Sequence, residues 1–163
     1  MLGLIELSGE ATPYELKTAV SLSLGNFWSI QHAQLYSEPE RLAKAGFVKE
    51  RREEGGRRRR HYSLTKRGTE ALAEWRESPA DRILELRDLG LLKVFFGADP
   101  ARVAERQIDL YRQELAKYEG LKQLDVGEQP RGPWTTLENG IRHTKLSIEF
   151  WEEQRRKRRR RRG

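Results

Sequence analysis

Residues 26–64 read NFWSIQHAQLYSEPERLAKAGFVKERREEGGRRRRHYSL, and this stretch decides the predicted fold of the first half of the chain. Its first part is a helix-forming segment that ends at Gly46. Two short strands follow, joined by a hairpin tip at Gly55-Gly56. A helix that can enter a major groove, next to a basic β-ribbon, is typical of a DNA-contacting surface in two parts.

The helix is predicted to run from an N-cap at Ser29 to about Ala45. One of its faces carries three apolar residues suited to a core: Ile30, Leu35 and Leu42. The outer face and its flanks then carry five other side chains: Gln31, His32, Gln34, Tyr36 and Arg41. Glutamine suits a bidentate contact with adenine, and arginine suits guanine or phosphate. A surface helix with no function beyond solvation would carry the same polar residues. Only the adjoining basic ribbon favours DNA binding over that explanation. Pro39 predicts a kink or a loosened turn, because it removes a backbone hydrogen bond.

The ribbon carries six arginines on about a dozen residues: Arg51, Arg52, Arg57, Arg58, Arg59 and Arg60. Edge strands often carry charge for solubility alone, which is the ordinary explanation. Such edges use lysine more often, and four consecutive arginines suit phosphate or minor-groove contact better.

The elements on either side of this stretch have clear start and stop signals. Residues 2–8 predict a short helix that ends at Gly9, and residues 12–15, Thr-Pro-Tyr-Glu, form a capping box for the next helix. Thr65 caps a later helix with Leu72 and Trp75 on its apolar side. That helix ends near Ser78, so residues 1–78 are predicted to form one domain.

Residues 79–154 are predicted to be all helical. An apolar helix covers residues 83–96, and Asp99-Pro100 starts the next one. Apolar residues recur at heptad spacing over residues 104–118 and again over 134–151, on either side of a turn at 125–133, which predicts a helical hairpin with coiled-coil-like packing. Leu146 and Phe150 lie off this seam. A second subunit would bury them, since most soluble oligomers are two-fold dimers.

The net charge of +7 is unevenly distributed. Residues 1–78 carry +2, residues 79–154 carry −3, and residues 155–163 carry +8. Eight like charges in a row repel one another, so residues 155–163 are expected to lack regular structure. They suit a non-specific DNA arm and a solubilising tail equally well, because a cationic run binds any polyanion.

Several functional classes find no support in the sequence. The chain has no cysteine, and its three histidines show no metal-ligand spacing. No nucleophile–base arrangement, phosphate-binding glycine loop or dinucleotide motif is present, so we expect neither an enzyme nor a cofactor. No apolar run approaches the ~20 residues of a membrane span, and residues 1–7 are unlike a signal peptide. We therefore expect a cytoplasmic protein without a membrane partner.

Four blocks, in order, resemble the PadR-like transcriptional regulators. The family's W-S-x-x-H-x-Q-L-Y signature corresponds to residues 28–36, and its R-L-x-x-x-G-x-V continuation to residues 41–48. The opening helices look like residues 2–5 and 13–17, and the second wing strand like residues 60–68. The chain departs from the family where Ser37 follows Tyr36, since many members have proline there and this chain has it at Pro39.

The resemblance implies a mainly α fold with a small β-wing: a winged helix-turn-helix domain followed by an all-helical dimerisation domain. It implies a homodimer that binds an inverted repeat in promoter DNA, usually as a repressor released by a small-molecule effector. A winged-helix module that binds protein or RNA, without sequence-specific DNA readout, is the alternative.

The resemblance also assigns roles by position. Tyr14 and Lys17 would lie near phosphates, and the arginines from Arg57 to Arg60 would be the wing contacts. The groove-facing helix would present Ser29, Gln31, His32, Gln34 and Tyr36. Trp75 and Trp134 are candidates for an effector pocket, although core packing is the preferred explanation for all four tryptophans.

Overall fold

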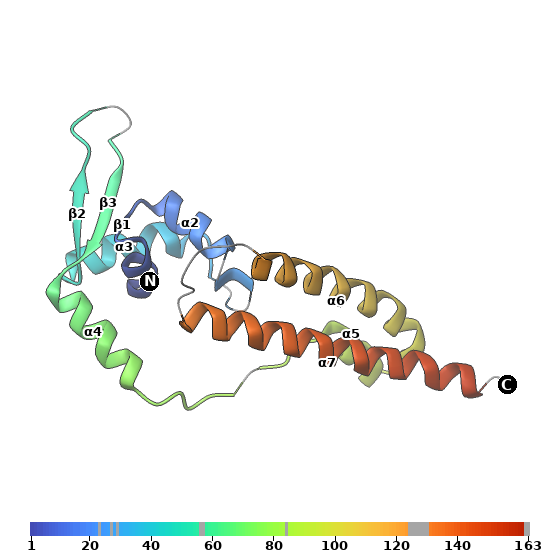
Figure 1. The fold of residues 1–163 in the computed structure, drawn as a ribbon. Helices are drawn as coiled ribbons and strands as arrows, with labels where there is room; N and C mark the ends of the chain where they lie inside the picture. Colours follow the sequence, from blue (N-terminus) through green and yellow to red (C-terminus); the bar gives the residue numbers. More distant parts are fainter. Residues whose placement is uncertain are drawn as a thin grey trace. The chain divides into compact units, whose positions relative to one another are not determined.

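The computed structural model describes residues 1–22, 24–26, 28, 30–55, 58–83, 85–123 and 131–161; at 22, 26, 131 and 158–161 it describes the backbone alone. The chain forms two compact units, Met1–Arg82 and Ile83–Gly163. From the sequence we predicted the domain boundary a little earlier, after residue 78, with residues 155–163 as a separate tail. Figure 1 shows the helices and strands of both units.

The first unit begins with α1 (Leu2–Ser8), which ends at Gly9 with φ 71°, a left-handed conformation that glycine adopts without strain. The predicted capping box starts α2 (Pro13–Leu22). The Thr12 N–H donates to Oε2 of Glu15 (2.8 Å), and the Glu15 N–H donates back to the Thr12 hydroxyl (3.3 Å). A short 3₁₀ turn, η1 (Leu24–Asn26), follows.

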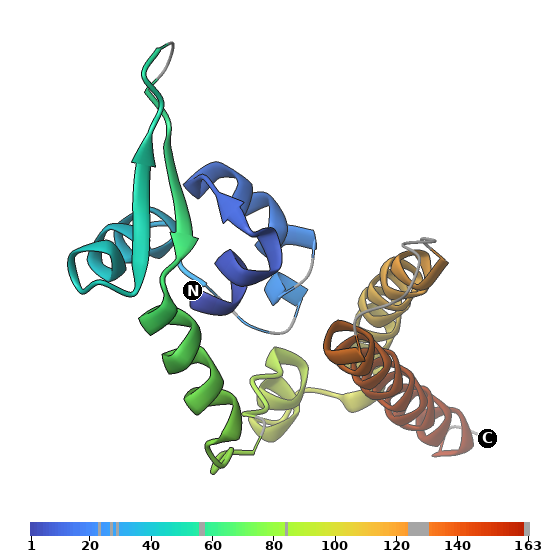
Figure 2. The same ribbon diagram turned by 60° about the vertical axis from the view of Figure 1, so that its left-hand side comes forward.

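The wing is formed by β2 (Val48–Arg52) and β3 (Arg60–Leu64). These strands pair antiparallel from Val48 opposite Leu64 to Arg52 opposite Arg60. Figure 2 shows them extending as a two-stranded arm from the helices of the first unit. A third strand, β1 (Glu10–Ala11), pairs with β3 at the base of this arm and gives the sheet order β1-β3-β2. The sequence predicted two strands, because two residues are too few to show an alternating pattern.

Helix α3 (Gln34–Lys44) begins five residues later than the predicted N-cap at Ser29. A tight turn precedes it, in which the Gln34 N–H donates to the Gln31 carbonyl (2.9 Å) and the Leu35 N–H to the His32 carbonyl (3.2 Å). Gln31 and His32 therefore lie in the turn before the helix and not on it. The helix continues through Pro39, which is buried.

The core of the first unit joins α1, α2, α3 and the sheet. Its buried side chains are Leu4, Ile5, Ala11, Leu16, Val20, Leu35, Leu42, Val48 and Tyr62. The core roles predicted for Leu35 and Leu42 are confirmed, and Leu64 packs against the cluster while only partly buried. This core holds the base of the wing and α3 in one rigid unit.

Helix α4 (Lys66–Glu77) starts as predicted, with the Thr65 side chain accepting from the Gly68 N–H (3.1 Å). Its Leu72 is buried, but the side chain of Trp75 is 71% exposed. Trp28 is also exposed, so the expected core packing of these two tryptophans is wrong for the single chain. Trp151 is buried as expected, and Trp134 is partly buried.

The second unit is built on α6 (Pro100–Gln123) and α7 (Arg131–Arg161). Its core cluster consists of Ala104, Ile108 and Trp151, all residues of the predicted heptad seams. Thr144 and Tyr118 are buried along the same seams, which confirms the helical hairpin.

The apolar helix predicted over residues 83–96 is much shorter in the structure. Among the described residues of this range, helix is confined to α5 (Leu89–Phe95), and the Asp88 side chain caps it by accepting from the Leu91 N–H (3.0 Å). Ile83 and Leu86 are non-helical and largely exposed. An apolar run forms a stable helix when a partner buries one face, and nothing within the described part of the single chain covers these two residues.

Residues 155–161 continue α7, whereas the sequence led us to expect no regular structure there. Lysine and arginine are good helix formers, and cations near a helix C-terminus interact favourably with the helix dipole. Both effects favour the helical continuation.

Candidate nucleic-acid interface

The exposed side of α3 carries three of the predicted reading residues. Gln34 is exposed, the Tyr36 side chain is 44% exposed, and Arg41 points into solvent with its guanidinium paired to Glu38 (2.8 Å). Gln31 and His32 are exposed in the turn just before the helix, and the His32 ring lies 5.3 Å from the Tyr36 ring. The helix start and its preceding turn therefore present polar and aromatic groups together. Ser29 lies outside the described residues.

Gln34 also closes the turn through its side chain. Its Oε1 accepts from the Gln31 N–H (3.2 Å). A bidentate contact with adenine needs both the oxygen and the nitrogen of the amide. A contact with adenine would share the Oε1 of Gln34 with the Gln31 N–H, since an amide oxygen has two lone pairs.

The wing arginines differ in how they are engaged. Arg51 pairs with Glu10 (2.8 Å), Arg52 with Glu50 (2.6 Å), and Arg60 with Glu40. Arg58 and Arg59 are exposed and have no ion pair with any residue that the structure describes. Arg57 lies outside the described residues. Of the predicted phosphate contacts on the wing, Arg58 and Arg59 are thus the ones whose charge is available.

Arg58 occupies a backbone position that glycine or asparagine would fill more easily. Its φ is 48°, in the left-handed region, where a side chain with Cβ costs about 1–2 kcal/mol. An arginine at this position is not explained by turn geometry. The role of its guanidinium as a wing contact stays a prediction.

The paired carboxylates are held in their charged form. Hydrogen bonds from Arg51 lower the pKa of Glu10, and hydrogen bonds from Arg41 lower the pKa of Glu38. The hydrogen bond from Arg52 likewise lowers the pKa of Glu50. Because these groups stay ionised at neutral pH, they compete with phosphate for the same arginines. This competition was not predicted from the sequence, although Glu38, three residues before Arg41, forms a recognisable helix pair with it.

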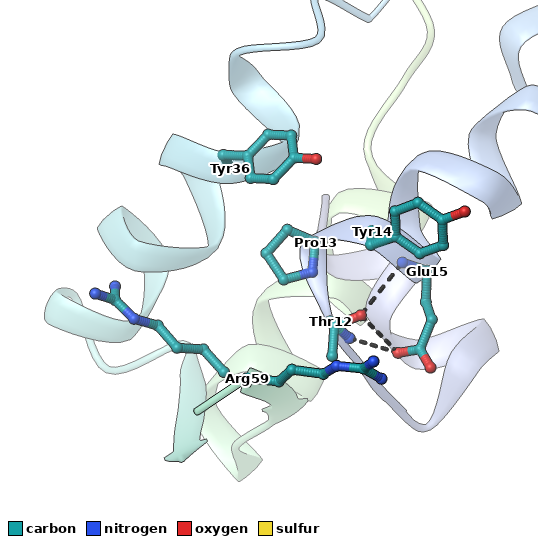
Figure 3. A pocket seen from close by; sticks show the side chains of 7 residues that line it. Thr12, Pro13, Tyr14, Glu15, Tyr36 and Arg59 are labelled. Carbon is teal, nitrogen blue, oxygen red and sulfur yellow. Dashed lines mark hydrogen bonds between the residues drawn. The ribbon is translucent and has the colours of Figure 1, made fainter. Parts of the chain in front are cut away.

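A recess of about 600 Å³ lies between the start of α2, α3 and the wing. Its lining is Thr12, Pro13, Tyr14, Glu15, Tyr36, Arg59 and Arg60. Figure 3 shows Tyr14 and Tyr36 on opposite sides of Pro13, with Arg59 reaching toward Thr12 and Glu15. Tyr14 is 70% exposed, and Lys17 on the next turn of α2 is exposed as well. The structure therefore brings four of the predicted residues together around this recess: Tyr14, Tyr36, Arg59 and Arg60.

The two tryptophans suggested for an effector pocket lie in different units. Trp75 is on α4, and Trp134 is on α7, where the Lys122 ammonium lies 5.5 Å from its ring centroid. Neither lines the recess described above, nor a second recess that is lined by Arg52, Glu53, Glu54, Arg58 and Arg60 of the wing. Their role in ligand binding stays a prediction.

The second unit exposes large apolar side chains on α5 and α7, and Leu110 on α6 is exposed as well. On α5 and the residue after it these are Leu89, Leu92, Phe95 and Phe96, and on α7 they are Leu146 and Phe150. Apolar groups of this size gathered on short stretches of helix usually mark a surface that a partner covers.

Other kinds of site lack support in the described part of the chain. No group of three histidine, aspartate or glutamate side chains is placed to hold a metal ion there. Among the described helices, none combines the length and the apolar character that crossing a bilayer requires.

Each half of the chain matches the model of a known protein family. Residues 1–74 match the model of the transcriptional regulator PadR-like family, and residues 86–157 match the virulence activator alpha C-terminal model. The negative transcriptional regulator PadR of Bacillus subtilis (strain 168) is 31% identical over 121 residues. That match covers 72% of this chain and 64% of that protein's length.

Two solved structures share the fold. Bacillus subtilis PadR in complex with operator DNA has a TM-score of 0.80 and 23% identity, covering 93% of this chain and 92% of that one. Bacillus subtilis PadR in complex with p-coumaric acid has a TM-score of 0.75 and 23% identity, covering 93% and 89%. At this identity the likeness is evidence for a common fold.

Proposed function

The chain belongs to the PadR-like family of transcriptional regulators, and on this premise we propose that it binds promoter DNA as a dimer and reads an inverted repeat. It acts as a repressor, and a small molecule releases it. Because its proposed target is DNA, the protein is proposed to act in the cytoplasm.

One observation supports DNA reading most strongly. Tyr36, near the exposed start of α3, lines one recess with Arg59 of the wing, and a core of nine buried side chains holds these elements in one unit. A reading helix beside a cationic ribbon allows base contacts and phosphate contacts at once. The phosphate contacts set the position on DNA, and the α3 side chains supply the base preference.

Dimer formation follows from the apolar surface of the second unit. Burying a large apolar side chain contributes about 1.5–3 kcal/mol, and Leu146 and Phe150 are exposed in the single chain. A two-fold dimer buries each of them twice and presents two copies of α3. Two copies related by a two-fold axis read an inverted repeat, so the symmetry of the site follows from that of the protein.

Repression and release by an effector rest on the relatives. The Bacillus subtilis relative is a negative transcriptional regulator, and a protein of the same fold binds p-coumaric acid. Since this chain covers 64% of the first relative, both properties are proposals for it. A fall in operator affinity on adding p-coumaric acid or another small planar acid would support them.

Selection of bound sequences from a random duplex library tests the central proposal. We expect an enriched inverted repeat, with the two halves separated by about one helical turn of DNA or a multiple of it. A single enriched half-site would contradict the dimeric mode of reading.

Two other outcomes would overturn the proposal. Recovery of no motif, with binding equal for all duplexes, would remove the reading role of α3. Preferential binding to RNA in a parallel selection would instead make this a winged-helix module for a different partner.

A further inference from the structure

We propose that Glu40 is a positioning residue for DNA binding: through its ion pair with Arg60 it holds the wing in a fixed place beside α3 before DNA binds. The pair thereby sets the distance between the reading side chains of α3 and Arg59, the proposed phosphate contact of the wing. This inference rests on the proposed function, because it assumes that α3 and the wing contact the same duplex.

Arg60 lies on the face of the wing that is turned toward the core. Side chains of a strand alternate between its two faces, so Arg60, Tyr62 and Leu64 of β3 point to the same side. Tyr62 is 1% exposed and belongs to the core of the first unit, and Leu64 packs against that core. Arg60 is therefore on the inner face, two residues beyond Tyr62 in the direction of the wing tip.

Glu40 reaches this inner face from α3. Its Oε1 accepts a hydrogen bond from Nη1 of Arg60, and the side chains of Glu40 and Arg60 are 45% and 40% exposed. Of the ion pairs between residues that the structure describes, this one alone joins α3 to a wing strand. Above the buried base of the wing, the pair is thus the polar link that keeps β3 close to α3.

Arg60 also connects to the second strand of the wing. Its Nε lies 3.9 Å from Oε1 of Glu50 on β2, and that oxygen pairs with Arg52 as well (2.6 Å). The other carboxylate oxygen of Glu50 accepts from the Tyr62 hydroxyl (3.4 Å). Because these contacts join β2 to β3, a link from α3 to Arg60 holds both strands.

A second ion pair holds the opposite face of the wing. Arg51 points to that face, since it is the neighbour of Arg52, and its guanidinium donates twice to Glu10 of β1 (3.0 and 2.8 Å). In the strand register Arg52 lies opposite Arg60, and Arg51 is the next position along. The wing is therefore held from both faces at neighbouring positions just beyond the core.

Charge alone and positioning predict opposite effects of Glu40→Gln. The substitution removes a negative charge from the proposed DNA surface and releases Arg60, so charge alone would tighten binding to every duplex. If Glu40 positions the wing, the variant must order the wing on binding, and this entropy cost weakens binding to the duplex that needs the wing in its place. An unrelated duplex imposes no such placement, so its binding should not weaken.

The first test measures the affinity of the full chain for two duplexes, the selected inverted repeat and an unrelated sequence. We expect Glu40→Gln to lower the ratio of the two affinities by up to about fivefold for each half-site, the upper range for a partly exposed ion pair. Arg60→Lys should keep the ratio, because a single nitrogen of Arg60 donates to Glu40. Glu38→Gln is the matched control and should keep it too: it removes the same charge from the same helix, but Glu38 pairs with Arg41 of α3 and not with the wing.

A double-mutant cycle tests whether the two residues act as a pair. The cycle compares Glu40→Gln, Arg60→Gln and the chain with both changes. Positioning through the pair predicts that the double variant lowers the ratio no more than either single variant does. Additive losses would overturn the proposal, and so would a ratio that is unchanged or higher in Glu40→Gln.

The place of the wing can also be measured without DNA. The chain has no cysteine, so Lys44→Cys on α3 and Glu54→Cys near the wing tip accept two spin labels specifically. With labelled chain diluted in unlabelled chain, double electron–electron resonance should give a broader distance distribution once Glu40→Gln is added. Equal widths would overturn the positioning role even where the unmodified chain selects an inverted repeat. Recovery of no repeat by the unmodified chain would instead overturn the proposed function, and with it the DNA role of the pair.

Discussion

The guanidinium of Arg60, on β3, pairs with the carboxylate of Glu40, on α3, and its Nε also lies 3.9 Å from Oε1 of Glu50 on β2. The neighbouring Arg59 has no such partner among the described residues and lines the recess between α2, α3 and the wing. Arg60, the first residue of β3, and Arg59, just before it, therefore differ in their ion pairing. Arg60 ties the wing to α3, and Arg59, which has no ion pair with a described residue, is the one proposed to contact a phosphate.

This difference predicts unequal effects of the same substitution. Arg59→Gln should weaken binding to every duplex and make the salt dependence less steep by about 0.9 if Arg59 neutralises one phosphate. Arg60→Gln removes the same formal charge but should leave the slope close to that of the unmodified chain, because Arg60 is already neutralised. Fluorescence anisotropy over a salt series measures both. An equal decrease of slope in the two variants would mean that Arg60 exchanges its carboxylates for phosphate on binding.

The apolar surface of α7 predicts the oligomeric state. Leu146→Ser and Phe150→Ser should each weaken dimerisation at least about tenfold, the equivalent of ~1.4 kcal/mol, since each residue would be buried twice in the dimer. Sedimentation velocity at micromolar concentration should show a shift toward monomer. Leu7→Ser, at a similarly exposed leucine of α1, is the matched control and should not shift the equilibrium. Dimers of unchanged strength in both α7 variants would place the interface elsewhere.

Tyr118 predicts an alkaline loss of stability. Burial, together with a hydrogen bond and the charge of Glu114, raises the pKa of Tyr118 from 10.0 to about 12. Because the folded pKa is raised, the neutral phenol favours the folded state; that contribution is complete below pH 10 and disappears as the pH rises toward 12. The thermal unfolding temperature should therefore fall more steeply between about pH 10 and 11.5 in the unmodified chain than in Tyr118→Phe. Parallel pH profiles of the two would show that Tyr118 titrates normally.

Features set by a few neighbouring residues were predictable from the sequence. The capping box at Thr12 and Glu15, the stop at Gly9 and the cap at Thr65 each depend on contacts within four residues. The heptad seams of α6 and α7 were predictable because a regular period reports which face is buried.

Features that depend on distant partners were not predictable. Strand β1 is two residues long and exists through its pairing with β3, some fifty residues later. The pair of Arg51 with Glu10 also joins distant parts of the chain, so the sequence could not show which wing arginines are neutralised. Ile83 and Leu86 are apolar without being helical, because apolar character alone does not supply the partner that would bury a helix face.

The most direct test of DNA reading by α3 is to run the random-duplex selection in parallel with the unmodified chain and with Gln34→Ala. We predict that both recover the same inverted repeat. The variant should have a weaker preference at one symmetric pair of positions, with about 1–3 kcal/mol less discrimination for each bidentate contact that is removed. Identical base preferences at every position would contradict the assignment of Gln34 as a reading residue and, with it, of α3 as the reading helix.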